Sequence, residues 1–213
     1  MSMWNKAATD YSLYLIADYG IAGVELLQLV QEALAGGVSI VQLRAKALNA
    51  REFCALGKEM LALTTSCHVP LIINDRVDIA QALGAAGVHL GPDDLPADMA
   101  RKILGQHCIV GVSARTRAEA RLAVQQGADY VGVGAVFPTA TKADATHIGL
   151  TVLAGIVGDL SIPVLAIGGI DASNAATILD HGADGLCVAS AILKAASPRL
   201  AAAEIRNLVF SRR

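Results

Sequence analysis

Short apolar runs alternate with helical patterns along almost the whole chain. Runs rich in Val, Ile and Leu that are bounded by Gly, Pro, Asn or Asp predict buried strands. Apolar residues at helical spacing between these runs predict helices. The predicted strands lie at 11–16, 38–43, 71–73, 88–90, 108–112, 129–133, 163–167 and 185–188. The predicted helices lie at 24–35, 50–64, 80–83, 98–104, 118–126, 150–158, 174–179 and 199–211.

Local signals support several of these boundaries. Asn49 with Glu52, and Thr116 with Glu119, have the spacing of a capping box at a helix start. Gly-rich turns that precede a strand recur at 36–38, 84–88, 127–129 and 182–184. Gly is the usual residue just past a helix end, so this repeat indicates one helix-to-strand turn that is used many times.

The alternation predicts an α/β fold, a (β/α)8 TIM barrel that forms a single domain over residues 1–213. Eight strand–helix units in 213 residues is the count of a compact barrel. An open, doubly wound sheet is the alternative, but the GxGxxG fingerprint is missing after the first strand. No Pro- or Ser-rich linker indicates a second domain.

Composition agrees with buried parallel strands, since 54% of residues are hydrophobic and 17% are charged. The net charge of −2 gives no general attraction to nucleic acid or to a membrane. No apolar run reaches the roughly 18 residues of a membrane span, and the first residues lack a signal-peptide core. Four cysteines without a CxxC pair indicate a reducing compartment, and we expect a cytoplasmic protein.

Polar residues collect where the predicted strands end, which is where barrels of this kind carry their active sites. Asp75 follows one strand, and Asp93 and Asp94 follow the next. Carboxylates at adjacent strand ends can share Mg²⁺, which keeps other positions for water and phosphate. Asp75 and Asp94 could instead cap helices. The pair favours the metal, and we prefer Asp94 to Asp93 as the second ligand.

Gln42, Arg44 and Lys46 alternate along one strand exit, so their side chains can share a face. An Arg fork, a Lys point charge and an amide donor suit a diphosphate. The alternative is a solvated strand exit without function. We favour the binding site because Gln42 still lies within the apolar run and should face inward.

A second anion site is predicted at the last two strands. Gly168-Gly169 and Ala189-Ser190 follow strands where such barrels often bind phosphate through backbone N–H groups. The alternative is a pair of tight turns. The long loop 134–149 should bind ligand, with Thr139, Thr141 and Lys142 as contacts and Phe137 as an anchor.

The histidines point to no catalytic role. His89 lies inside a predicted strand and should be a satisfied core residue, whereas His147, in the loop, is the one with a fair chance of ligand contact. There is no Ser-His-Asp set and no obvious nucleophile. A site that binds a leaving diphosphate needs neither, because cations can stabilise the charge that develops as a C–O bond breaks.

Several runs together resemble the thiamine phosphate synthase family. They are QLRAK, INDRVDIAQALGAAGVHLGPDDLP, GVSARTRAEA, GADYVGVGAVFPTATK, IPVLAIGGI and ADGLCVASAI, in family order between residues 14 and 193. The resemblance implies a barrel enzyme that transfers an alkyl group other than methyl. It would join hydroxymethylpyrimidine diphosphate to a thiazole phosphate, giving thiamine monophosphate and diphosphate by a dissociative, Mg²⁺-assisted mechanism.

The resemblance also implies roles for individual residues. The pyrimidine diphosphate would contact Gln42, Arg44, Lys46, Asn74, Ser113 and Lys142, of which we expect Arg44, Ser113 and Lys142 to be catalytic. Asp75 and Asp94 would hold Mg²⁺. The thiazole phosphate would contact Thr139, Thr141, Gly169, Ala189 and Ser190. Arg115 departs from the family pattern and could alter substrate binding.

Two other functions compete with the synthase. A related thiazole tautomerase would have no use for a metal-diphosphate subsite, and here all the residues expected for that subsite are present. A non-catalytic binder of thiamine phosphates could use Mg²⁺ as well. We expect small-molecule substrates and no nucleic acid or membrane partner; a homo-oligomer is possible.

Overall fold

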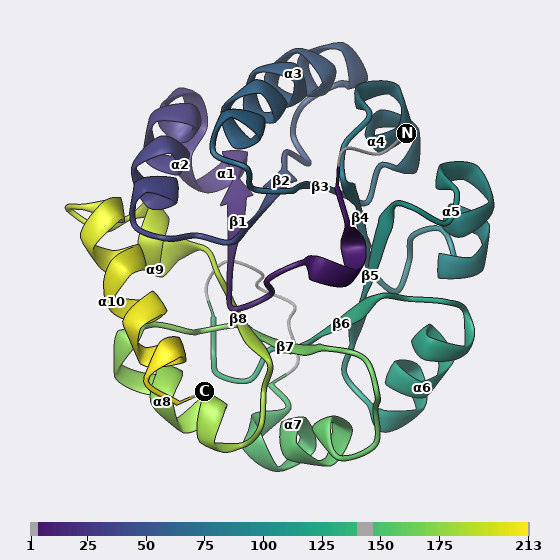
Figure 1. The fold of residues 1–213 in the computed structure, drawn as a ribbon, viewed down its shortest axis with the longest axis vertical. Coiled ribbons are helices and arrows are strands. Elements are labelled where there is room, and N and C mark those ends of the chain that lie inside the picture. Colours follow the sequence, from purple (N-terminus) through teal and green to yellow (C-terminus); the bar gives the residue numbers. More distant parts are fainter. Residues whose placement is uncertain (1–3, 140–146, 213) are drawn as a thin grey trace.

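The computed structural model describes residues 4–139 and 147–212. Within them, eight parallel strands pair in chain order, and the last pairs with the first to close a barrel. Figure 1 looks down this barrel and shows the helices as a ring around it. The strands are β1 (Leu13–Asp18), β2 (Ile40–Arg44), β3 (Leu71–Asn74), β4 (Gly87–Leu90), β5 (Ile109–Ala114), β6 (Tyr130–Gly134), β7 (Val164–Ile167) and β8 (Gly185–Val188). The predicted (β/α)8 TIM barrel is confirmed.

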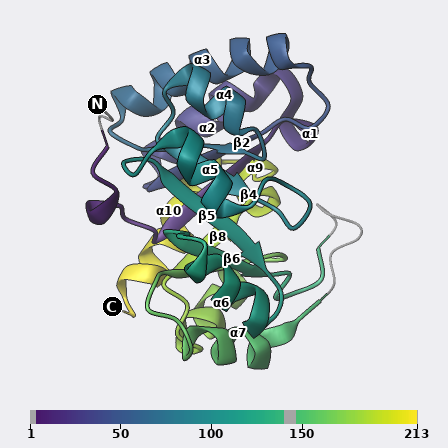
Figure 2. The ribbon, with the colours of Figure 1, turned by 90° about the vertical axis from the view of Figure 1, so that its right-hand side faces the viewer.

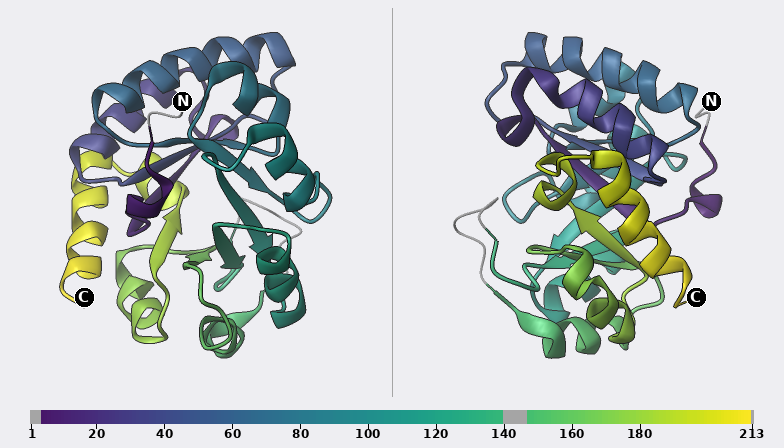
Figure 3. Two further views of the ribbon diagram at one scale, coloured as in Figure 1. Left: turned by 45° about the vertical axis from the view of Figure 1, so that its right-hand side comes forward. Right: turned by 90° about the vertical axis from the view of Figure 1, so that its left-hand side faces the viewer.

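Helices follow the strands and cover the outside of the barrel. They are α1 (Tyr19–Ala22), α2 (Leu26–Ala35), α3 (Ala50–Ser66), α4 (Val77–Leu83), α5 (Ala97–Leu104), α6 (Arg117–Gln125), α7 (Gly149–Val157), α8 (Ala172–Asp180), α9 (Ser190–Leu193) and α10 (Pro198–Phe210). Two 3-10 turns are η1 (Lys6–Ala8) and η2 (Gly23–Glu25). The C-terminal helix α10 packs against α2 and α8 and so completes the ring (Figure 3).

The strands are buried on both faces, as their near-continuous apolar sequences require. Leu13 and Leu15 of β1 belong to the large cluster that the helices cover. Tyr14 and Ile16 of the same strand belong to a smaller cluster with residues of the other strands, which fills the barrel. This period of two is the pattern of a pleated strand.

Most predicted elements are present, with boundary shifts that have local causes. The capping boxes at Asn49 and Thr116 are confirmed, with both reciprocal hydrogen bonds formed. The helix predicted from residue 24 begins at Leu26, because α1 and η2 precede it and Val24 is 90% exposed. The first strand runs to Asp18 instead of residue 16, since its pairing with β2 continues to that residue.

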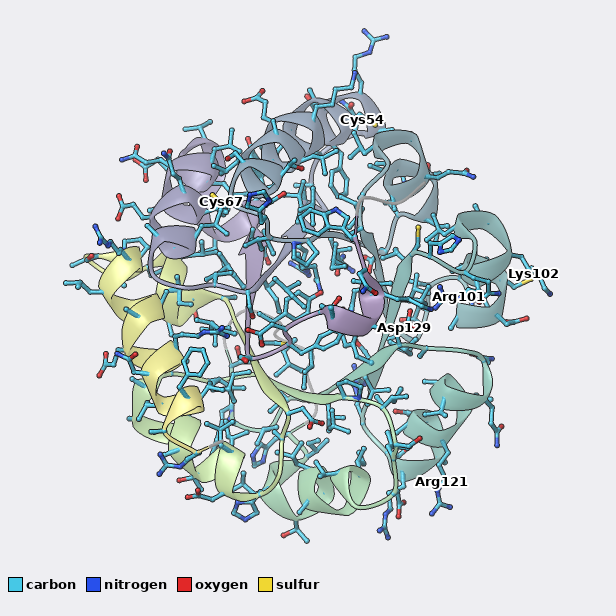
Figure 4. The ribbon with its side chains drawn as sticks, in the orientation of Figure 1. Cys54, Cys67, Arg101, Lys102, Arg121 and Asp129 are labelled. Carbon is cyan, nitrogen blue, oxygen red and sulfur yellow. The ribbon has the colours of Figure 1, made fainter. Side chains whose placement is uncertain are left out.

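The helix-to-strand end of the barrel is closed by charged contacts. Lys6 of η1 lies 2.8 Å from Asp129, whose other carboxylate oxygen is 2.6 Å from Arg101 of α5. Figure 4 shows Arg101 and Asp129 pointing toward one another, while Lys102 of the same helix points outward. Figure 2 shows η1 at this end, away from the loop that follows β4. None of the helices in the described part of the chain is long and apolar enough to cross a membrane.

Candidate active site

A cavity of about 210 Å³ opens where the strands end at their carboxyl termini. Every strand contributes to its wall. The candidate residues that the structure describes all line it: Gln42, Arg44, Lys46, Asn74, Asp75, Asp93, Asp94, Ser113, Thr139, Gly169, Ala189 and Ser190. Thr141 and Lys142 lie outside the described residues. Side chains from distant parts of the sequence therefore converge on one space.

Asp75 and Asp94 meet on one side of this cavity. Burial, and then a hydrogen bond and charge repulsion from Asp75, raise the pKa of the Asp94 carboxyl above its ordinary value. Gly91 donates its backbone N–H to Asp94 Oδ2 at 2.6 Å, and Lys46 Nζ lies 3.0 Å from Asp75 Oδ2. The negative charge of Asp75 thus disfavours ionisation of Asp94. Their donor set, oxygen only, suits a hard divalent cation that would neutralise both.

Neither carboxylate caps a helix, so the alternative interpretation as helix caps is wrong for both. The residue that precedes α4 is Arg76 and the one that precedes α5 is Pro96, and neither helix has a side-chain cap. Asp75 instead adopts a φ of 62° in a tight turn in which Arg76 N–H donates to Asn74 C=O at 2.8 Å. Backbone strain of this kind in a non-glycine residue is concentrated at functional sites.

The Asp93 side chain is exposed, whereas Asp94 is half-buried and contacts Asp75. The geometry therefore favours Asp94 as the partner of Asp75. Among the described residues no group of three or more His, Cys, Asp or Glu side chains has the arrangement of a metal site. A cation held here by Asp75 and Asp94 would keep positions for water and phosphate oxygens.

Arg44 is held in place by Asp18, which is not among the site residues predicted from the sequence. Arg44 Nη1 lies 2.5 Å from Asp18 Oδ2, and the second carboxylate oxygen of Asp18 accepts the N–H of Gly20 at 2.9 Å. Asp18 is only 3% exposed and itself lines the cavity. Because this contact fixes the planar guanidinium, it also fixes the directions of the Arg44 N–H groups that do not bind Asp18.

The floor of the cavity is a chain of hydrogen bonds between buried side chains. Gln42 Nε2 donates to Tyr14 Oη at 2.8 Å, and Tyr14 and Tyr130 hydroxyls lie 2.7 Å apart. His89 Nδ1 is 2.9 Å from Tyr130 Oη, and its Nε2 is 2.9 Å from Ser113 Oγ. Burial raises the pKa of both tyrosines well above the ordinary value, so both hydroxyls keep their protons. Gln42 faces inward, as predicted.

The expectation for the histidines needs a correction. His89 is a satisfied, 7% exposed residue as expected, but it also lines the cavity. His147 is exposed and is not among the residues that line the cavity. A side chain at β4 points into the barrel because alternate strand residues do so, and the alternation that selected Gln42 could also have selected His89.

The opposite side of the cavity is built from backbone turns. Gly168 and Gly169 follow β7 with φ values of 98° and 64°. Asn174 donates to the C=O of Gly169 at 2.8 Å, and its amide oxygen caps α8 by accepting the N–H of Asp171 at 3.1 Å. Segment 135–139 lies along this turn, because Phe137 N–H donates to Gly168 C=O at 3.1 Å. Phe137 packs on the core, as predicted.

Ala189 and Ser190 complete this side. Ala189 precedes α9, which begins at Ser190 and has no side-chain cap. The first N–H groups of a helix lack intrahelical acceptors, so an uncapped start that borders a cavity is suited to an anion. Arg115 follows β5 and also lines the cavity, to which it adds a cationic side chain. In the sequence, this residue is notable only because it departs from the family pattern.

Comparisons with known proteins give one consistent result. The profile of the family described as thiamine monophosphate synthase matches residues 13–192. A thiamine-phosphate synthase of Alkaliphilus oremlandii is 49% identical over 185 residues, 86% of this chain and 88% of that protein. One of Methanobrevibacter smithii is 47% identical over 192 residues, 90% and 92% of the two chains. The solved thiamine phosphate pyrophosphorylase of Pyrococcus furiosus superposes with a TM-score of 0.89 at 40% identity, covering 96% of this chain and 98% of that one.

Proposed function

The chain belongs to the thiamine monophosphate synthase family, and we propose that its cavity couples 4-amino-2-methyl-5-hydroxymethylpyrimidine diphosphate to hydroxyethylthiazole phosphate. As an enzyme of this family it is a transferase of thiamine biosynthesis. The products would be thiamine monophosphate and diphosphate. With free cysteines at positions 54, 67, 108 and 187, the protein suits a reducing compartment, and we propose the cytoplasm.

One observation carries the proposal: the cavity has two chemically different sides. Cationic and carboxylate side chains (Arg44, Lys46, Asp75 and Asp94) line one side, and glycine turns with an uncapped helix start line the other. A metal-bound diphosphate suits the first side. A monophosphate monoester suits the second, where backbone N–H groups can bind its oxygens.

We propose that Asp75 and Asp94 hold Mg²⁺. The raised pKa of the Asp94 carboxyl, caused by its burial and by Asp75, supports the proposal because a divalent cation would neutralise both groups. When bound, Mg²⁺ supplies charge neutralisation for the leaving diphosphate. Lys46, which contacts Asp75 at 3.0 Å, would then be released to the diphosphate.

The chemistry we propose requires no nucleophile from the protein. The C–O bond between the pyrimidine methylene and the diphosphate breaks, and the bonding electron pair leaves with the diphosphate. Arg44, Lys46 and Lys142 stabilise that departing charge. The methylene cation is stabilised by the aminopyrimidine ring, and the thiazole nitrogen captures it with its lone pair. Ser113 and Asn74 orient the ring, and Thr139, Thr141, Gly169, Ala189 and Ser190 hold the thiazole phosphate.

A coupling assay tests this function. The protein is incubated with both substrates and Mg²⁺, and thiamine monophosphate and released diphosphate are measured. We expect both products in equal amounts. Isomerisation of the thiazole without coupling would instead support a tautomerase, and tight binding without turnover would support a binding protein.

The metal assignment is tested with Asp75→Ala and Asp94→Ala. Each variant should lose Mg²⁺-dependent turnover by at least roughly a hundredfold, because an essential charge-neutralising ligand is missing. Calorimetry of the folded proteins with Mg²⁺ and inorganic diphosphate should show weaker binding than in the wild type. Asp93→Ala, at an exposed neighbouring carboxylate, is the matched control. Full activity of both variants at limiting Mg²⁺ would refute the assignment.

A further inference from the structure

The hydrogen-bond chain beneath the cavity links two of the proposed substrate contacts through residues that have no assigned role. It runs from Gln42 on β2, through Tyr14 on β1 and Tyr130 on β6, to His89 on β4 and Ser113 on β5. All four heavy-atom distances lie between 2.7 and 2.9 Å, within the normal range of hydrogen bonds. Gln42 and Ser113, at the two ends, both line the cavity.

The fold makes room for this chain by omitting side chains beside it. A Cβ on Gly111 of β5 would lie 2.0 Å from Tyr130 Cζ and 2.3 Å from its hydroxyl oxygen. A Cβ on Gly132 of β6 would lie 3.2 Å from His89 Cε1. The His89 and Tyr130 rings stack with centroids 5.6 Å apart, and the Tyr14 ring meets Tyr130 edge-on at 5.8 Å. The aromatic side chains are therefore fixed by packing as well as by hydrogen bonds.

The number of hydrogens that each group can donate gives this chain of hydrogen bonds a direction. A phenol has one hydrogen to donate, and a neutral imidazole has one donor and one acceptor nitrogen. Because Gln42 Nε2 donates to Tyr14, the Tyr14 hydrogen goes to Tyr130, and the Tyr130 hydrogen goes to His89 Nδ1. The imidazole proton is then on Nε2 and is donated to Ser113 Oγ. This leaves the Ser113 hydroxyl hydrogen and the Gln42 carbonyl oxygen for the cavity.

We propose that Tyr14, Tyr130 and His89 are positioning residues that act as one directional relay, which holds Ser113 as a donor and the Gln42 carbonyl as an acceptor toward a heteroaromatic ring. Reversing any one bond requires reversing all of them, so the two ends change roles together. The inference rests on the proposed function in one respect. The ring is the aminopyrimidine, whose ring nitrogens accept hydrogen bonds and whose amino group donates them.

The relay is tested first without substrate, by ¹⁵N NMR of the His89 imidazole in the full-length protein. Comparison with His89→Asn assigns the signals. In the wild type we expect Nδ1 without a proton and Nε2 with one. Tyr130→Phe removes the donor to Nδ1, so the imidazole should become a mixture of tautomers. Tyr14→Phe removes the hydrogen bond that orients the Tyr130 hydroxyl, so the wild-type tautomer should become less dominant. The change should be smaller than in Tyr130→Phe, because Tyr130 can still donate to His89.

Steady-state kinetics supply a second readout. Tyr130→Phe and Tyr14→Phe should each lower kcat/KM for the pyrimidine diphosphate by about tenfold, the usual effect of a lost, oriented hydrogen bond. The KM for the thiazole phosphate should not change. Tyr11→Phe is the matched control: its ring centroid is 5.2 Å from that of Tyr130, but its hydroxyl is not part of the chain. It should keep wild-type kinetics and wild-type His89 signals.

Two results would overturn the relay. One is a wild-type His89 that carries its proton on Nδ1. The other is a folded Tyr130→Phe protein whose imidazole signals match those of the wild type. A wild-type protein that fails to couple the two substrates would refute the proposed function, and the NMR comparison would still decide the relay.

Discussion

At the scale of single residues, the site depends on side chains that are absent as much as on those that are present. Gly111 leaves the space that the Tyr130 ring and hydroxyl occupy, and Gly169 combines a φ of 64° with close approach to the backbone of segment 135–139. The sequence pointed to Gly169 as a phosphate contact but not to its close packing, and it did not point to Gly111 at all. Glycine is required at each position because a residue distant in the sequence packs where its side chain would be.

Gly111→Ala should destabilise the protein by about 1–3 kcal/mol, the usual cost of overpacking a well-packed core. The added Cβ would lie 2.0 Å from Tyr130 Cζ, so the ring or the strand must move. Thermal unfolding measures the change. Gly158→Ala is the control, because there the nearest atom to the added Cβ is a carbonyl oxygen at 3.6 Å. Equal melting temperatures of the two variants would contradict the packing argument.

At the scale of elements, the short helix α9 and the turn after β7 form the side of the cavity that we assign to the thiazole phosphate. Ser190 is the first residue of α9 and lines the cavity. Sequence alone predicted this location because both strand exits carry small residues. It did not show that the Asn174 side chain holds the Gly169 carbonyl, a contact that fixes the turn.

Ser190→Glu should raise the KM for the thiazole phosphate more than that for the pyrimidine diphosphate, by roughly tenfold or more, because a carboxylate would repel the monophosphate at close range. Two-substrate kinetics measure both constants. Ser190→Gln, similar in size but neutral, separates charge from bulk. A larger effect on the pyrimidine diphosphate would mean that the two subsites are interchanged.

An ion pair between Arg206 and Asp10 joins the last helix to the segment just before the first strand. Burial by itself would raise the pKa of Asp10, but hydrogen bonds from Arg206 and Ser12 outweigh it and hold that pKa below the ordinary value. Arg206 Nη2 lies 2.5 Å from Asp10 Oδ2 and joins α10 to the chain just before β1. A carboxyl with a lowered folded-state pKa stabilises the fold above its unfolded-state pKa, and this stabilisation is lost as pH falls through the folded-state pKa.

Asp10→Asn should therefore lower the melting temperature at pH 7 by a few degrees, as expected for a half-exposed pair worth about 1 kcal/mol or less. The difference from the wild type should shrink as pH falls below the ordinary Asp pKa of 3.8. Melting curves across this pH range test it. Asp180→Asn, which breaks the more exposed pair with Arg212, should have a smaller effect. A difference that grows in acid would refute the explanation.

At the scale of the whole molecule, the two ends of the barrel have separate tasks. The strand carboxyl ends carry the cavity, and the opposite end carries the buried contacts of Arg101. Its guanidinium contacts the carbonyls of Gly105, Cys108 and Gly127 as well as the Asp129 carboxylate. We therefore expect this network to stabilise the fold and to have no part in catalysis, since active sites in this fold lie at the other end of the barrel.

Arg101→Met should destabilise the protein by about 3 kcal/mol, because three part-buried carbonyls and the Asp129 carboxylate each lose a hydrogen bond from the guanidinium. Asp129 keeps its contacts with Lys6 and the Val110 N–H. The melting temperature should fall by roughly 6–12 °C in a domain of this size. The kcat/KM measured well below that temperature should equal the wild-type value. Lys102→Met, on the same helix with 72% of its side chain exposed, is the control. A loss of kcat/KM in folded Arg101→Met would contradict the separation of tasks.

The sequence by itself determined the eight strands and their order, the barrel class and the strand ends at which polar side chains gather, but not the short helices α1 and α9. It could do so because the spacing of hydrophobic residues, the helix caps and the glycine turns are local signals, each of which is contained within a few residues. It also named Asp75, Asp94, Arg44 and Ser113 before any contact was known. Their roles with ligand stay predictions.

Only the tertiary structure decided which of those side chains meet and what holds them. Arg44 and Asp18 are 26 residues apart, and Tyr14 and Tyr130 are 116 apart. Barrel closure and strand register bring such pairs together, and both are set by the packing of the whole core. The same packing turned His89 from a core residue into part of the cavity wall. Contacts of this range have no local signature, and for that reason the sequence did not show them.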